Sequence, residues 1–135
     1  MLKQLSILAL ASLAAAAAPG KAKVVNNCPF EYSEQYTRDA KTGGRALKIT
    51  RERDGLYTGK AQTNFAYTLD PGQLWYDLSD VFGDAFAGNR VQVVSSNNQC
   101  QSIVWADGRP PAGSQVKTCT RESETTLTLC AAAPK

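Results

Sequence analysis

The sequence contains no histidine. Catalytic triads that use a histidine base and metal sites with histidine ligands are therefore excluded. The chain also lacks a glycine-rich phosphate loop after a predicted strand, and it has no Asn-x-Ser/Thr glycosylation site after the first residues. Nucleophilic catalysis by serine has no histidine base here, so candidate chemistry rests on carboxylates, aromatic rings and basic side chains.

Only one long hydrophobic run occurs, and it covers residues 5–18, between Lys3 and the Pro19-Gly20 pair. This layout is typical of a secretory signal peptide. The run is shorter than the roughly 20 apolar residues that span a bilayer. We predict a signal peptide over residues 1–17 and one secreted domain over residues 18–135, with no transmembrane segment. Cleavage one residue later and an uncleaved anchor are the alternatives.

Four cysteines occur, and no two of them lie two to four residues apart, which disfavours a zinc site. An even number in a secreted chain predicts disulfides. Three pairings are possible, of which we expect Cys28–Cys130 and Cys100–Cys119. The first would join the opening strand to the closing strand, and the second would clamp the loop 106–114. No metal or cofactor is expected.

Apolar and polar residues alternate along the chain, and no convincing helical period occurs. The motif Asp70-Pro71-Gly72 separates two alternating runs and is typical of a tight turn. Seven short strands are expected, near residues 24–28, 46–49, 65–69, 74–78, 91–94, 102–105 and 125–130. The pattern predicts an all-β fold, a small antiparallel β-sandwich held by two disulfides.

Residues 65–86 carry four aspartates and no basic residue, namely Asp70, Asp77, Asp80 and Asp84. Acidic side chains after a Trp-Tyr pair suggest a carbohydrate-facing cleft, whereas turn chemistry is the alternative. Glycoside hydrolysis generally needs two carboxyl groups across the bond, so Asp77 could act with Asp80 or Asp84. Asp77 and Asp80 would point to opposite faces of a continuous strand, and they converge only if the chain already turns at Asp80.

Two tryptophans could stack on sugar rings, with burial in the core as the alternative for each. Trp75 lies in an alternating run, and Trp105 precedes the loop 106–111, which could display it. The candidate ligand-binding residues are thus Asp77, Asp80, Asp84, Trp75 and Trp105.

Residues 38–60 carry seven basic and three acidic side chains, whereas residues 61–89 carry only acidic ones. A basic surface could bind an anionic polymer or a membrane, and a solvated surface is the alternative. No aromatic residue interleaves the basic run before Tyr57, so nucleic acid is not expected as a partner.

Several segments resemble the Blastomyces yeast-phase-specific protein family, which is similar to thaumatin-like proteins. They occur in order as VVNNCPF (24–30), GGRALKIT (43–50), FAYTLD (65–70), WYDLSDVFGDAF (75–86) and TTLTLC (125–130). The resemblance implies a thaumatin-like β-sandwich, secretion and association with the fungal wall, surface or culture fluid. It implies no established catalytic activity.

Larger thaumatin-like proteins have an acidic cleft linked to binding, and sometimes cleavage, of β-1,3-glucans. The resemblance places Asp77 at one acidic position, but Ala66 and Phe82 occupy the two others. It also places a strand and a loop after Phe30 that this chain lacks. A real deletion and a segment missing from the gene model are the alternatives, and an exposed sheet edge there would invite pairing with another chain.

These features favour a secreted, non-catalytic protein of the cell wall or host surface, of the antigen or virulence-associated kind. Its expected partners are a fungal wall polysaccharide, a host polysaccharide or a host protein. The alternatives are a weak endo-β-1,3-glucanase and a secreted effector or toxin that acts through its basic face.

Overall fold

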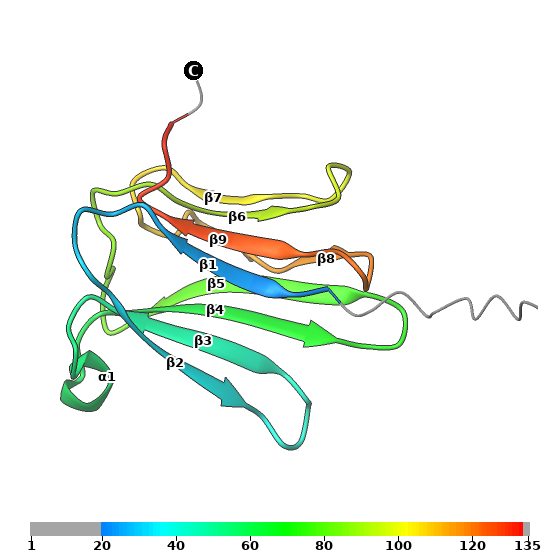
Figure 1. Ribbon diagram of the computed structural model, residues 1–135, viewed down its shortest axis with the longest axis horizontal. Coiled ribbons are helices and arrows are strands. Elements are labelled where there is room, and N and C mark those ends of the chain that lie inside the picture. Colours follow the sequence, from blue (N-terminus) through cyan, green and yellow to red (C-terminus); the bar gives the residue numbers. More distant parts are fainter. Residues whose placement is uncertain (1–19, 134–135) are drawn as a thin grey trace, which may run out of the picture.

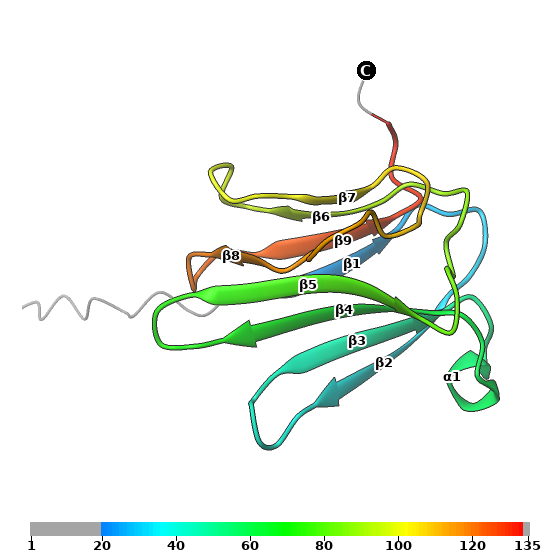
Figure 2. The same cartoon turned by 180° about the vertical axis from the view of Figure 1, so that it is seen from behind.

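Two β-sheets pack face to face in the computed structural model, which describes residues 20–133 (Figures 1 and 2). One short helix, α1 (Gly55–Thr58), lies at one end of the strands. The signal peptide predicted over residues 1–17 lies outside the described residues.

The chain visits the two sheets in an order that brings its first and last strands together. The four-stranded sheet has the order β1-β9-β6-β7, with β1 at Ala22–Asn26, β9 at Thr125–Leu129, β6 at Val91–Ser95 and β7 at Ile103–Trp105. The five-stranded sheet has the order β2-β3-β4-β5-β8, with β2 at Ser33–Arg38, β3 at Arg45–Thr50, β4 at Gln62–Leu69, β5 at Leu74–Val81 and β8 at Lys117–Cys119.

All seven expected strands are present, and the two-sheet architecture is confirmed. The sandwich is not wholly antiparallel, because β1 pairs with β9 in parallel, with Val24 opposite Leu127. The expectation of a purely antiparallel fold is wrong at this one pair. Two further strands, β2 and β8, were not predicted.

The core lies between the sheets and consists of the residues that alternate inward along each strand. Leu127 and Leu129 of β9 are fully buried, as the alternation predicted. Burying a large apolar side chain stabilises the fold by about 1.5–3 kcal/mol. The largest fully buried side chains are Trp105, Tyr76, Phe65, Phe86, Ile49, Leu74 and Leu78.

Both expected disulfides are confirmed. Cys28 after β1 bonds to Cys130 after β9, with 5.0 Å between the Cα atoms. Cys100 in the β6–β7 loop bonds to Cys119 in β8, with 5.5 Å between the Cα atoms, and this bond links the two sheets. All four thiols are used, so the zinc alternative does not apply.

The strands on either side of Phe30 lie at sheet edges. β1 is the outer strand of one sheet and β2 the outer strand of the other, which leaves one side of each strand unpaired within residues 20–133. Each of the two strands therefore presents an open edge within the described residues. Within the same residues, no helix is long and apolar enough to cross a membrane.

Candidate ligand-binding surface

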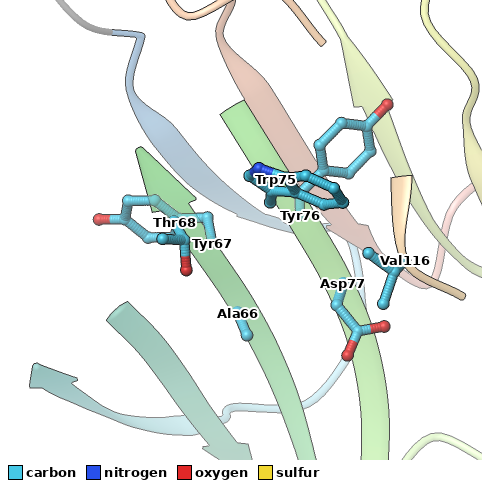
Figure 3. Close-up of a pocket in the computed structure, with 7 residues that line it drawn as sticks. All are labelled: Ala66, Tyr67, Thr68, Trp75, Tyr76, Asp77 and Val116. Carbon is cyan, nitrogen blue, oxygen red and sulfur yellow. The ribbon is translucent and has the colours of Figure 1, made fainter. Parts of the chain in front are cut away.

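The outer face of the five-stranded sheet carries a shallow pocket beside Trp75. Along β5, Leu74, Tyr76 and Leu78 are buried, so the odd-numbered Trp75 and Asp77 lie on the opposite, outer face. The pocket has a volume of about 180 Å³, and we call it the Trp75 pocket (Figure 3). Its lining residues come from β4, β5 and the approach to β8, and they are Ala66, Tyr67, Thr68, Trp75, Tyr76, Asp77 and Val116.

The indole of Trp75 is exposed and fixed in place. It is 40% exposed, and its Nε1 donates a hydrogen bond to Asp70 Oδ2 at 2.7 Å. Asp70 Oδ1 also accepts hydrogen bonds from the backbone N–H groups of Gly72 and Gln73, at 2.8 Å each. These donors, the indole first, lower the pKa of Asp70. The β4–β5 turn therefore holds the indole through Asp70, a role that the sequence analysis missed.

Asp77 is the only carboxylate among the residues that line the Trp75 pocket. It is half-buried on β5, opposite Ala66 on β4. Burial raises the pKa of Asp77, and a hydrogen bond from the backbone of Leu78 opposes this shift. An Asp with a raised pKa can exchange a proton or accept a hydrogen bond from a sugar hydroxyl.

Asp80 lies on the inner face of β5, away from Asp77. The strand continues to Val81, so the two carboxylates project to opposite faces, and the turn that would bring them together does not occur. Thr63 Oγ1 donates a hydrogen bond to Asp80 Oδ1 at 2.6 Å, whereas Asp80 Oδ2 is buried without a partner among the described residues. Burial, reinforced by the nearby Asp84, raises the pKa of Asp80 to about 7.

Asp84 lies next to Asp80 rather than next to Asp77. Its Oδ2 is 3.6 Å from the Nε of Arg109, so a surface ion pair partly neutralises it. The structure thus brings together Asp80 and Asp84, and it separates both from the outer face that carries Asp77.

Trp105 does not present a ring to solvent. It is 1% exposed, lies in the core, and donates from Nε1 to Gln115 Oε1 at 3.1 Å. Of the two alternatives for Trp105, display by the following loop and burial in the core, the structure has burial, because β7 turns this side chain inward. It has no free face on which to stack a sugar.

Within residues 20–133, no cluster of three or more acidic or cysteine side chains is placed to hold a metal ion.

Residues 30–131 match the model of the family described as Blastomyces yeast-phase-specific protein. The chain belongs to this family.

Two known proteins resemble this family member. An antigenic thaumatin-like protein from Arthroderma benhamiae is 29% identical over 109 residues, which cover 74% of this chain and 54% of the relative. The chain therefore spans about half the length of that curated relative. The crystal structure of the protein elicitor MoHrip2 from Magnaporthe oryzae has a TM-score of 0.68 at 22% identity, covering 83% of this chain and 99% of that chain. That likeness shows a shared fold.

In this Blastomyces yeast-phase-specific family member, the two positions at which the sequence comparison expected further acids carry none. Ala66 places a methyl group opposite Asp77 in the pocket. Phe82 follows β5 with a φ of 61° and is 72% exposed. The outer face therefore offers one carboxylate and one exposed tryptophan side by side.

Proposed function

We propose that this chain is a secreted, non-catalytic protein that acts at a cell wall or host surface by binding polysaccharide on the outer face of its five-stranded sheet. The observation that carries the proposal is the exposed indole of Trp75, held by Asp70 next to Asp77. A flat indole that is fixed in advance can stack on a sugar ring with little loss of side-chain entropy.

The groups around the indole suit a neutral sugar. Asp77 can accept hydrogen bonds from sugar hydroxyls, and Thr68, opposite Trp75 on β4, can both donate and accept. Ala66 keeps the space beside Asp77 open because its side chain is small. The next pair on this face, Asn64 and Ser79, adds polar groups along the same direction, which suits an extended chain of sugars.

Binding without cleavage is supported by the separation of the carboxylates. Glycoside hydrolysis generally uses a second carboxyl group within about 10 Å across the bond. The Trp75 pocket contains one carboxylate, Asp77, and the nearest candidate along β5, Asp80, lies on the other face. The raised pKa of Asp77 would suit an acid catalyst, so a weak β-1,3-glucanase remains the alternative to be tested.

Secretion is supported by the two disulfides, which are typical of oxidising compartments. The relative from Arthroderma benhamiae is named antigenic, and a role at the host surface is the corresponding proposal here.

The test is a pull-down of the oxidised protein on insoluble β-1,3-glucan and on chitin, with released sugar measured in the same tubes. The matched variants are Trp75→Ala and Tyr57→Ala, because Tyr57 is also an exposed aromatic residue but lies on α1, outside the pocket. We expect Trp75→Ala to lose binding and Tyr57→Ala to keep it. Equal binding by all three proteins would contradict the proposed surface.

Sugar release separates the binding protein from the enzyme. The proposal expects retained protein and no released sugar above background. Release that disappears in Asp77→Asn would instead establish a glucanase. Failure to bind either polymer would contradict the proposed polysaccharide classes.

A further inference from the structure

A second pocket is lined by residues from the connection between β1 and β2, from the start of β2 and from the segment between β3 and α1. It has a volume of about 280 Å³ and we call it the Arg51 pocket. Its lining is mostly polar and shares no residue with the Trp75 pocket; it consists of Glu31, Tyr32, Ser33, Arg51 and Arg53.

Arg51 is held in a stack of planar groups that runs into the core. Its guanidinium carbon lies 3.7 Å from the centroid of the Phe30 ring. The Phe30 ring stacks in turn on Phe86, with 6.4 Å between the centroids, and Phe86 is fully buried. A guanidinium that stacks through its face keeps the N–H groups on its edge available for a ligand. Arg51 is therefore ordered before a ligand arrives.

Arg53 follows two residues later in a turn that is tied to β2. Ser33 Oγ donates a hydrogen bond to the backbone carbonyl of Arg53 at 3.3 Å. Glu52, between the two arginines, lies 3.9 Å from the ammonium group of Lys60. Among the described residues, no carboxylate lies within ion-pair distance of Arg51 or Arg53. Two guanidinium groups thus line one pocket, and neither is in an ion pair with a carboxylate.

Two arginines suit a single oxyanion with several oxygens, because each guanidinium can form paired hydrogen bonds. The same lining contains the carboxylate of Glu31 and the hydroxyl of Tyr32. Glu31 repels a bare anion, but it accepts hydrogen bonds from hydroxyl groups. A ligand that suits both the arginines and Glu31 carries an anionic group next to free hydroxyl groups.

We propose that the Arg51 pocket binds an acidic saccharide, with a carboxylate or sulfate group on Arg51 and Arg53 and a neighbouring hydroxyl on Glu31. This site is separate from the proposed surface for neutral polysaccharide around Trp75. It gives a role to part of the basic run over residues 38–60.

Titration calorimetry of the oxidised full domain at low salt tests this site. The probes are trigalacturonate, which supplies carboxylates, a sulfated heparin disaccharide, and the neutral laminaritriose as a control. The variants are Arg51→Gln, Arg51→Lys and Arg53→Gln, with Arg38→Gln as the matched control, because Arg38 lies in the same basic run on β2 and outside the pocket. Thermal unfolding of each variant verifies that it is folded.

We expect one of the two acidic sugars to bind. Laminaritriose is titrated into the Trp75→Ala protein, which lacks the proposed surface for neutral polysaccharide, and we expect it not to bind there. Each glutamine variant should weaken binding about tenfold or more, and Arg51→Lys should do nearly the same because lysine has no planar fork. Arg38→Gln should change the affinity by less than about twofold, as expected for a distant, screened charge. Trp75→Ala should leave this binding intact, which separates the two sites.

Three outcomes would overturn the proposal. Equal losses in Arg38→Gln and Arg51→Gln would mean that the basic surface attracts anions diffusely. Inorganic sulfate that binds as tightly as the sugars would remove any role for the saccharide. Binding to vesicles with phosphatidylserine, together with no binding to either acidic sugar, would make the partner a membrane.

Discussion

Thr63 on β4 and Asp80 on β5 face each other across the strand pair, and the Thr63 hydroxyl donates to the Asp80 carboxylate at 2.6 Å. This hydrogen bond satisfies one oxygen, while the other is buried without a partner among residues 20–133. Burial disfavours the charged form, and Asp84 adds negative charge nearby. The carboxylate therefore holds its proton up to about pH 7, well above its ordinary pKa of 3.8.

This arrangement predicts that stability falls as the pH rises through a defined window. Between the unfolded pKa of 3.8 and the folded pKa of about 7, the folded state binds more protons at Asp80 than the unfolded state does. The free energy of unfolding therefore decreases with pH in that window and is unaffected by this group above it. Because the carboxylate is only half-buried, we expect a loss of about 1–2 kcal/mol rather than the full value.

Asp80→Asn should remove this part of the pH dependence, because an amide does not titrate in this range. The amide oxygen can still accept the hydrogen bond from Thr63, so the local packing should be kept. Urea unfolding at pH 4.5, 6 and 8 measures how the free energy of unfolding changes with pH in the two proteins. Asp54→Asn is the control, because Asp54 is exposed and its side chain makes no capping hydrogen bond to α1. An Asp80→Asn protein with the same decline between pH 4.5 and 8 would contradict the assignment.

Gly108 allows the loop after β7 to pack directly on the chain after β5. Its φ is +67°, and a Cβ atom there would lie 1.9 Å from the carbonyl oxygen of Phe86. Gly108→Ala must move one of the two backbones, so we expect a loss of about 3 kcal/mol or more in the free energy of unfolding. Gly113→Ala is the matched control, because Gly113 also has a positive φ, of +95°, but no atom lies within 4 Å of its Cβ position.

Gly113→Ala should lower the free energy of unfolding by about 1 kcal/mol, the strain of an alanine in a left-handed backbone conformation. Chemical denaturation of both variants gives the comparison. Similar losses in the two would show that the approach of Gly108 to Phe86 is not tight in solution.

The alternation of apolar and polar residues in the sequence was sufficient to predict the strands that bury one face. It predicted that Leu127 and Leu129 point the same way, and it gave opposite faces for Asp77 and Asp80 once the strand continued. It could not predict β2, because Glu34, Gln35 and Tyr36 are all exposed and show no alternation. This edge strand forms because β3 offers its hydrogen-bonding groups.

Features of the fold that depend on contacts between distant segments could not be predicted from the alternation of residues. The direction in which β1 runs beside β9 is not encoded in alternation, which is the same for parallel and antiparallel pairs. The three residues of β8 pair with β5 where the disulfide of Cys119 holds them. The inward-facing Trp105 can be buried because the side chain of Gln115, ten residues further along the chain, accepts the hydrogen bond of its indole N–H.

The two disulfides should differ in their contribution to stability. Cys28–Cys130 closes a segment of 102 residues, whereas Cys100–Cys119 closes one of 19. In the chain-entropy model these bonds stabilise by about 4–5 and about 3 kcal/mol. Replacing each pair with alanines and measuring urea unfolding tests the order. A larger loss for Cys100→Ala/Cys119→Ala would show that its link between the sheets outweighs the loop entropy.

The Asp70–Trp75 hydrogen bond predicts that the turn controls the exposed indole. Asp70→Ala removes the acceptor of the indole N–H and of two backbone N–H groups in the turn. We expect the ring of Trp75 to become mobile and its fluorescence more accessible to acrylamide, whereas the buried Trp105 stays protected. The pKa of Asp70 is lowered, so the same change should appear in the unmodified protein only on acidification below the ordinary Asp pKa of 3.8. Since the ordered indole is what the proposed polysaccharide surface relies on, Asp70→Ala should also weaken glucan or chitin binding about as much as Trp75→Ala does. Unchanged quenching in Asp70→Ala would show that packing on the sheet, rather than the turn, fixes the indole.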